Sequence, residues 1–150
     1  DAAVEFVRKT KINSLAVAIG TSHGAYKFAG KAKLNLEILK EIKQRLGMPL
    51  VLHGASGVPK FLVDRAKKFG LKMGSAEGVP DDQIMKAVKL GINKINTDTD
   101  LRLSFTTSVR ETLKKHPEEF DPRHYLGPAR DYVQKIVEHR MQVFGSKGKA

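Results

Sequence analysis

Two histidines in the chain each follow a short apolar run and are followed at once by glycine. His23 comes after the run Leu15–Ile19, and His53 comes directly after Pro49–Leu52. The two histidines lie thirty residues apart, about the length of one strand–helix–strand unit, so both imidazoles are expected at the carboxyl end of one parallel sheet. Because neutral imidazole is a good zinc ligand, the pattern predicts a paired-histidine metal site. Histidines that simply end strands and bond to the backbone fit these residues equally well.

Small residues beside the second histidine form a candidate anion loop. Gly54-Ala55-Ser56-Gly57 precedes an expected helix, so its amides and the Ser56 hydroxyl are placed to hold a phosphate. An ordinary turn is the alternative, and the spacing is not that of a serine nucleophile elbow. Polar residues 96–100 follow the third apolar run, where Asn96 and Asp98 are candidates for ligand contacts. Capping of the next helix by Thr99 or Asp100 is the alternative, and it can coexist with such contacts. The other three histidines are interpreted as surface residues: His116, His124 and His139.

Three short apolar runs, at 14–19, 49–53 and 92–97, are typical of strands buried on both faces. Between and around them, apolar residues recur at helical spacing. Helices are expected over 2–9, from Leu34 to Gly47, from Pro59 to Gly70, from Asp81 to Gly91, along Leu101 to Leu113, and over 129–144. In the helix after Pro59 the buried stripe is expected to be Leu62, Val63 and Ala66. The other repeating apolar residues are Ile38, Ile42 and Leu46; Ile84, Met85 and Val88; and Phe105 and Val109.

The remaining segments are expected to be irregular: a loop excursion at 70–80, a loop at 121–128 and a mobile tail at 145–150. Alternating strands and helices favour a parallel sheet with right-handed crossovers. Three strands do not close a barrel, so strands from another segment are expected to complete the sheet.

Composition narrows the class of protein. The 150 residues include no cysteine, which excludes disulfides, a thiolate nucleophile and cysteine-bound zinc. No run approaches the roughly 20 apolar residues of a membrane span, and the first residues lack the pattern of a signal peptide, so a cytoplasmic location is expected. The net charge of +11 is spread over every helix. Solvated lysines, attraction of a phosphorylated small molecule and a more acidic companion segment each account for it better than nucleic-acid binding.

Four motifs, in order, resemble the class II, metal-dependent fructose-bisphosphate aldolases. They are Gly20-Thr-Ser-His-Gly-Ala-Tyr-Lys27, Leu52-His-Gly-Ala-Ser-Gly57, Lys94-Ile-Asn-Thr-Asp-Thr-Asp-Leu-Arg102 and Asp121-Pro-Arg-His-Tyr-Leu-Gly-Pro-Ala-Arg130. The resemblance runs along essentially the whole chain. It implies an α/β fold in which residues 1–150 form the C-terminal half of a single (β/α)8 TIM barrel, with three parallel strands and flanking helices.

The same resemblance implies roles for individual residues. His23 and His53 match two of three zinc ligands, and zinc would act as a Lewis acid on the ketose carbonyl of fructose 1,6-bisphosphate, which is cleaved to dihydroxyacetone phosphate and glyceraldehyde 3-phosphate. A monovalent cation, Na+ or K+, often binds nearby. Residues that match substrate- or phosphate-binding positions of the family are Gly24, Lys27, Gly54, Ser56, Asn96, Asp98, Thr99, Arg102 and Arg123, the last often reaching in from a neighbouring subunit of a dimer or tetramer.

One part of the family pattern lies outside this sequence. The third zinc histidine and the aspartate that moves the proton belong to the N-terminal half, so no catalytic acid or base is assigned here. The isolated chain is expected to be inactive without that half. Two alternatives stay open: an aldolase for the epimeric tagatose 1,6-bisphosphate, and, from another class, a non-catalytic phosphate- or nucleic-acid-binding module. The aspartate at position 98 favours the fructose epimer.

Overall fold

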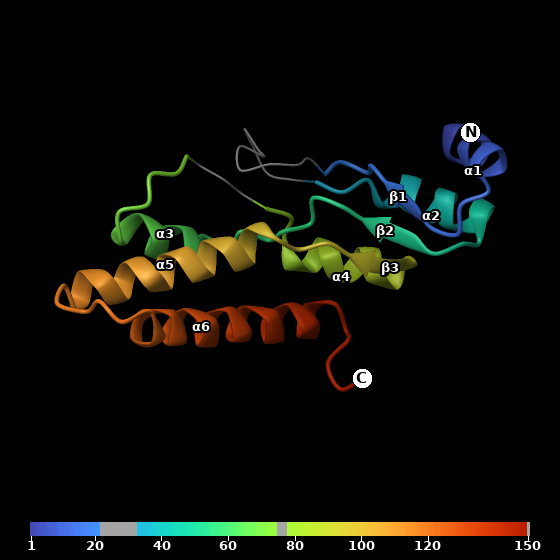
Figure 1. The fold of residues 1–150 in the computed structure, drawn as a ribbon. Coiled ribbons are helices and arrows are strands. Elements are labelled where there is room, and N and C mark those ends of the chain that lie inside the picture. The colour runs from blue at the N-terminus through green and yellow to red at the C-terminus, as the bar shows by residue number, and fades with distance from the viewer. Residues whose placement is uncertain (22–32, 75–77, 150) are drawn as a thin grey trace.

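The computed structural model describes residues 1–21, 33–74 and 78–149. Helices and strands alternate along these ranges as expected (Figure 1). The strands are β1 (Leu15–Val17), β2 (Leu50–Leu52) and β3 (Ile92–Ile95); the helices are α1 (Ala2–Thr10), α2 (Leu36–Leu46), α3 (Lys60–Lys68), α4 (Asp81–Lys89), α5 (Thr99–Lys115) and α6 (Pro122–Val143).

The three strands form one parallel sheet in the order β1-β2-β3, which confirms the predicted α/β class. In register, Ala16 lies beside Val51 and Val51 beside Lys94, and a register shift falls between Leu50 and Val51 where β2 meets β3. Each strand is shorter than its apolar run because the ladder ends where the chain turns toward the loops at the carboxyl edge. These loops are the part of the sheet that concerns function.

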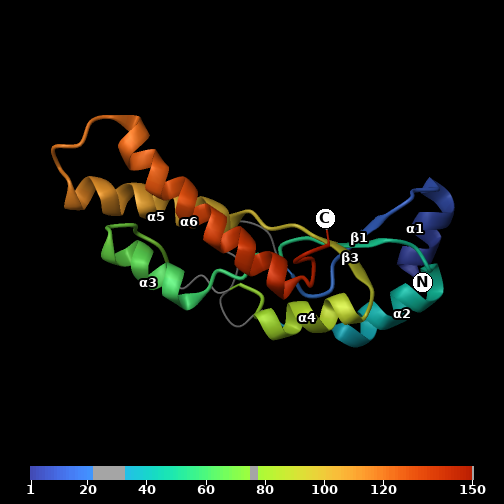
Figure 2. The same cartoon turned by 90° about the horizontal axis from the view of Figure 1, so that it is seen from below.

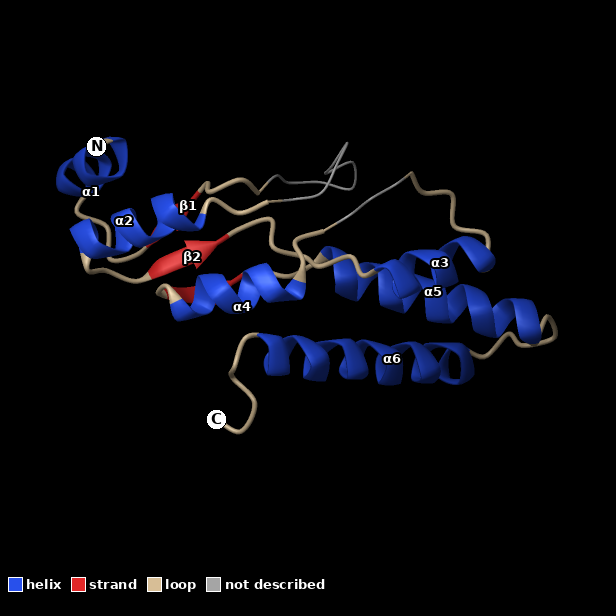
Figure 3. Ribbon diagram, turned by 180° about the vertical axis from the view of Figure 1, so that it is seen from behind, coloured by secondary structure: helices blue, strands red, loops and turns tan. Residues whose placement is uncertain are grey.

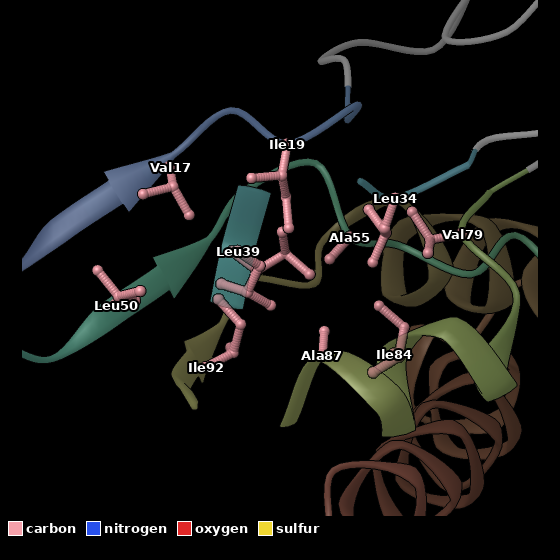
Figure 4. Packing of buried hydrophobic residues seen from close by; sticks show 11 residues of the cluster. Val17, Ile19, Leu34, Leu39, Leu50, Ala55, Val79, Ile84, Ala87 and Ile92 are labelled. Carbon is pink, nitrogen blue, oxygen red and sulfur yellow. The ribbon is translucent and has the colours of Figure 1, made fainter. Parts of the chain in front are cut away.

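One face of the sheet is covered, and the other is open. Val17, Leu50 and Ile92 point toward α2 and α4, where they pack with Leu39, Ile84 and further apolar side chains in one buried cluster (Figure 4). Because side chains alternate along a strand, the opposite face carries the register row Ala16, Val51 and Lys94. Ala16 and Lys94 are exposed and Val51 is half-buried, so this second face has no cover from the described residues.

Helices α3, α5 and α6 form a second packing unit beside the sheet. Helices α5 and α6 run antiparallel and side by side, away from the sheet (Figures 1 and 3). Seen from below, α3 lies along α5, and α4 lies near the carboxyl end of α6 (Figure 2). A smaller apolar cluster of Val58, Leu62, Val63, Ala66 and Leu103 joins α3 to α5.

The buried side of α3 is the predicted one, with Leu62, Val63 and Ala66 buried. On α5 the repeating apolar residues mark the helix but not its buried side: Phe105 and Leu113 are each 38% exposed. The buried side instead holds Leu103 with small polar residues such as Ser104 and Thr107, which allow close approach to the neighbouring helices. On α2 the helix begins only after Asn35, whose side chain accepts a hydrogen bond from the Ile38 amide; Leu39 is therefore the buried residue and Ile38 faces outward. On α4, Met85 is exposed and Ala87 takes the buried position.

The segment expected as a loop at 121–128 is the beginning of α6. Asp121 is the N-cap residue and its carboxylate accepts a hydrogen bond from the Arg123 amide at 2.9 Å. Pro122 occupies the first helical position, where a missing amide costs nothing. Pro128 lies inside the helix. In the described ranges no helix is long and apolar enough to cross a membrane.

Candidate functional site

The candidate site lies at the carboxyl edge of β2 and β3. His53 follows the last residue of β2, and Asn96 follows the last residue of β3. The backbone N–H of Asn96 donates a hydrogen bond to the Leu52 carbonyl at 3.0 Å, which extends the pairing of β2 and β3 by one residue. The sheet thereby brings the two side chains together, with Asn96 Nδ2 at 3.0 Å from His53 Nδ1 and 3.2 Å from Nε2. Strand alternation places both on the open face.

This pair has the chemistry of a metal ligand and its orienting partner. A metal-bound histidine uses one ring nitrogen for the metal and needs a hydrogen-bond partner for the other. The Asn96 Nδ2 that faces the ring is itself a donor and pairs only with a ring nitrogen that carries a lone pair; with the carboxamide turned over, Oδ1 is the acceptor that the remaining N–H of a metal-bound imidazole needs. Among residues 1–21, 33–74 and 78–149, no three His, Cys, Asp or Glu side chains gather in a metal-binding group. His23, Gly24 and Lys27 lie outside the described residues.

Ser56 is buried beside the amino end of α5 and is 2% exposed. Its Oγ accepts hydrogen bonds from the backbone amides of Asp98 and Thr99, both at 3.2 Å. A hydroxyl has two lone pairs and one proton, so these two amides occupy its acceptor capacity and leave it only a proton to donate. Ser56 therefore caps α5 from outside the helix and is a fixed donor, which suits an anion. The expectation that Thr99 or Asp100 caps α5 is wrong: Asp98 is the N-cap residue and makes no side-chain cap bond.

The loop at 54–58 is held by a buried carboxylate. Asp100 is fully buried; its Oδ2 accepts from the Gly57 amide at 3.0 Å and its Oδ1 from the Val58 amide at 2.7 Å. Val58 has a φ of 40°, a left-handed conformation that costs a β-branched residue roughly 1–3 kcal/mol. Gly54, with a φ of 65°, makes the turn directly after His53. The loop is thus a constrained structure.

The segment before α4 closes over the same loop. The Val79 amide donates to the Ser56 carbonyl at 3.2 Å. A Cβ at Gly78 would collide with the carbonyl oxygens of Ser56 and Gly57, so only glycine permits this approach. The described parts of the expected excursion, 71–74 and 78–80, lie outside helices and strands.

Asp98 and Arg102 form an exposed pair on the first turn of α5. Arg102 Nε donates to Asp98 Oδ1 at 2.9 Å, and the two side chains are 80% and 67% exposed. The guanidinium keeps most of its donors for a further anion. Both residues lie one helical turn or less from the Ser56 cap, so they belong to the rim of the same site.

Arg123 is not brought to this site. It lies at the amino end of α6, at the far end of the α5–α6 hairpin (Figure 1). Since α5 has 17 residues, this end lies roughly 25 Å from the Ser56 cap at a rise of about 1.5 Å per residue. Here Arg123 pairs with Asp121, and its guanidinium lowers the pKa of the Asp121 carboxyl while the carboxylate raises the pKa of Arg123.

Two residues that shape the site, Asp100 and Arg140, were not predicted as site residues from the sequence. Asp100 was considered only as a helix cap, because a short polar motif at a strand end offers that local explanation first. Nothing in the sequence around Arg140 marks it as a site residue, because it lies on an amphipathic helix. The fold shows that its side chain is 4% exposed and directed at the loop.

Comparisons with known proteins agree with the geometry. A family model for class II fructose-bisphosphate aldolase matches residues 1–149. The chain is 55% identical to the fructose-bisphosphate aldolase of Thermus caldophilus over 97% of its own length, and 47% identical to that of Giardia intestinalis over 99%. It covers 48% and 46% of those two proteins.

A solved structure gives the same result for the fold. The crystal structure of the YdjI aldolase from Escherichia coli K12 superposes with a TM-score of 0.75 at 33% identity, covering 100% of this chain and 46% of that one. The chain thus spans about half the length of the curated relatives it matches, as expected for half of a barrel. Sequence match and fold together show that the chain belongs to the class II fructose-bisphosphate aldolase family.

Proposed function

We propose that this chain supplies one half of the active site of a zinc-dependent fructose-1,6-bisphosphate aldolase. The observation that carries the proposal is the convergence of His53, Asn96 and Ser56 on one edge of the sheet, where Asn96 Nδ2 faces the His53 ring and Ser56 Oγ accepts hydrogen bonds from two backbone amides. The family membership supports the reaction class. The reaction would be the reversible cleavage of a ketose bisphosphate into dihydroxyacetone phosphate and glyceraldehyde 3-phosphate.

The residues present fit a zinc ion. His53 offers an imidazole beside the Asn96 carboxamide, whose Oδ1, with the amide turned over, is the acceptor that the second ring N–H of a metal-bound histidine needs. His53 and His23 would hold the ion together with a histidine from the N-terminal half. When bound, zinc supplies a Lewis acid for the ketose carbonyl. Asn96 orients the imidazole, and the aspartate that moves the proton is expected from the other half.

The contacts around the loop restrict which groups can bind the phosphate. Asp100 already engages the amides of Gly57 and Val58, and Ser56 Oγ engages those of Asp98 and Thr99. The groups left for the phosphate of the ketose half are the Ser56 hydroxyl proton and the Gly54 region, with Gly24 and Lys27 joining from the other loop. A monovalent cation beside this phosphate completes the proposed set.

The distal phosphate would be bound by arginine. Arg102 stands at the rim with donors to spare, and a guanidinium fork suits a phosphate. Arg123 lies too far from the loop to reach a substrate bound at its own chain's site. We therefore place it at the site of a neighbouring subunit, which requires the complete enzyme to be a dimer or larger homo-oligomer.

The proposal is tested on the complete protein that contains this chain. We expect it to release triose phosphates from fructose 1,6-bisphosphate, to lose this activity after dialysis against a chelator, and to regain it with Zn2+. Tagatose 1,6-bisphosphate, assayed in parallel, is expected to be cleaved at least tenfold more slowly, and faster cleavage of it would assign the epimeric reaction instead. Zinc-replete protein that cleaves neither ketose would overturn the proposal.

A further inference from the structure

Arg140 reaches the loop from a distant part of the chain. It lies near the carboxyl end of α6, yet its guanidinium occupies the space beside Gly57. A Cβ built on Gly57 would lie 2.6 Å from Arg140 Nη2 and 2.8 Å from Nη1. Only glycine leaves room for this contact, so the loop and the guanidinium fit each other closely.

The guanidinium joins the loop to three helices. Arg140 Nη1 donates to Asp81 Oδ1 on α4 at 2.7 Å, and its Nε lies 3.3 Å from Asp100 Oδ2 on α5. Asp100 in turn accepts hydrogen bonds from the amides of Gly57 and Val58. His139 Nε2 lies 3.0 Å from the second oxygen of Asp81. One buried side chain thus lies in ion-pair contact with the carboxylate that holds the loop, although its Nε makes no hydrogen bond with the described residues.

Gain in stability is a poor explanation for this group. When an ion network is buried, the free energy lost by removing the charges from water is usually about as large as the attraction gained between them. Proteins with apolar residues in place of such a network are often equally stable. Here the network also holds Val58 in a left-handed conformation, which adds a further cost. A cost of this kind is accepted where a loop must keep one shape. The loop in question carries Ser56 and directly follows His53.

The charge of Arg140 does not itself attract the substrate. Two carboxylates, Asp81 and Asp100, face its guanidinium and more than neutralise it. Its guanidinium is directed at Gly57 and at Asp81, so its contacts lie within the protein. Its contribution must therefore be geometric.

We infer that Arg140 is a positioning residue for phosphate binding: through Asp100 and Gly57 it holds the loop at 54–58 so that Ser56 presents its hydroxyl to the substrate. The inference rests on the proposed function, since it assigns the loop to the substrate phosphate. It adds to that function a residue from α6, outside the motifs at the strand ends.

The test compares Arg140→Met and Arg140→Lys in the complete protein. We expect both variants to raise the KM for fructose 1,6-bisphosphate by about tenfold or more, and the Kd for inorganic phosphate by a similar factor. The value of kcat and the zinc content are expected to stay within about threefold. Lysine is expected not to rescue binding, because it restores the charge but not the planar fork.

Arg65→Met is the matched control. Arg65 is also partly buried, pairs with Glu111 and lies over the Tyr132 ring, but it touches no residue of the loop. We expect this variant to lower Tm with no change in KM. As a second probe that leaves Arg140 in place, Gly57→Ala should push the guanidinium aside and raise KM as Arg140→Met does.

Two results would overturn the inference: an unchanged KM and phosphate Kd in Arg140→Met, or equal rises in the Arg140 and Arg65 variants, which would mean general loosening. Absence of cleavage by the unaltered protein is a different outcome, because it contradicts the proposed function. In that case the phosphate Kd values still decide whether Arg140 positions the loop.

Discussion

At the scale of single residues, the site is organised by saturated hydrogen bonds. The carboxylate of Asp100 and the hydroxyl of Ser56 each accept two backbone amides. Four amides that a sequence motif would offer to a phosphate are thereby occupied within the protein. The consequence is that one proton, that of the Ser56 hydroxyl, becomes the best-defined donor of the loop.

This assignment predicts the effect of Ser56→Ala. A hydrogen bond to a charged group is worth about 1.5–3 kcal/mol, so its loss should raise the KM for fructose 1,6-bisphosphate by roughly 10- to 100-fold. Steady-state kinetics of the complete protein would measure it. Ser104→Ala is the control, because Ser104 is equally buried but bonds only to the Leu101 carbonyl within α5. A KM within twofold of the unaltered value, together with a fall in Tm like that of Ser104→Ala, would reduce Ser56 to a helix cap.

At the scale of elements, patterns of apolar residues predicted the strands, the helix order and the buried side of α3, but they do not show the buried side of every helix. Strand runs such as 49–53 are read correctly because both faces of a parallel strand are apolar. On α5 the apolar side, with Phe105 and Leu113, is the exposed one, since partner helices decide which side is buried. The same limit hid Arg140, whose position depends on how α6 returns along α5.

The beginning of α6 shows that a helix cap can turn an expected loop into helix. A loop is expected at 121–128, yet Asp121 caps a helix that includes both Pro122 and Pro128. The family motifs predicted single site residues more successfully than the apolar pattern predicted helix faces. The structure brings five of these residues to one edge of the sheet: His53, Ser56, Asn96, Asp98 and Thr99. What they bind there remains a prediction.

The Asp121 cap predicts a pH dependence of stability. The Arg123 side chain and then its backbone amide lower the pKa of Asp121 below its ordinary value of 3.8. A carboxyl with a lowered folded-state pKa stabilises the fold above its unfolded pKa, and this stabilisation is lost as the pH falls through the folded value. Asp121→Asn, which keeps the capping oxygen, should therefore lower Tm at pH 7.

Thermal unfolding of the complete protein, followed by circular dichroism from pH 7 downward, would measure this difference. It should shrink below about pH 4 and disappear once Asp121 is protonated. Asp131→Asn, an exposed change on the same helix, serves as the control. A difference in Tm that is the same at every pH would show that the ion pair with Arg123 contributes nothing.

At the scale of the whole molecule, the described helices cover only one face of the three-stranded sheet. One face of the sheet packs on α2 and α4, while the register row Ala16, Val51 and Lys94 and the side chains of His53 and Asn96 lie on the face that residues 1–21, 33–74 and 78–149 leave without cover. A closed barrel would place this face in its interior. Together with the half-length coverage of the relatives, this explains why one edge holds a well-built but partial site.

The central claim is that His53 is a zinc ligand of an aldolase. The most direct measurement is the zinc content and fructose 1,6-bisphosphate cleavage of the complete protein carrying His53→Ala, with His116→Ala, a change at an exposed helix end, as the control. We predict that His53→Ala loses bound zinc and lowers kcat/KM by about a thousandfold or more, while His116→Ala changes neither. Full zinc content with near-normal, chelator-sensitive cleavage in His53→Ala would contradict the account.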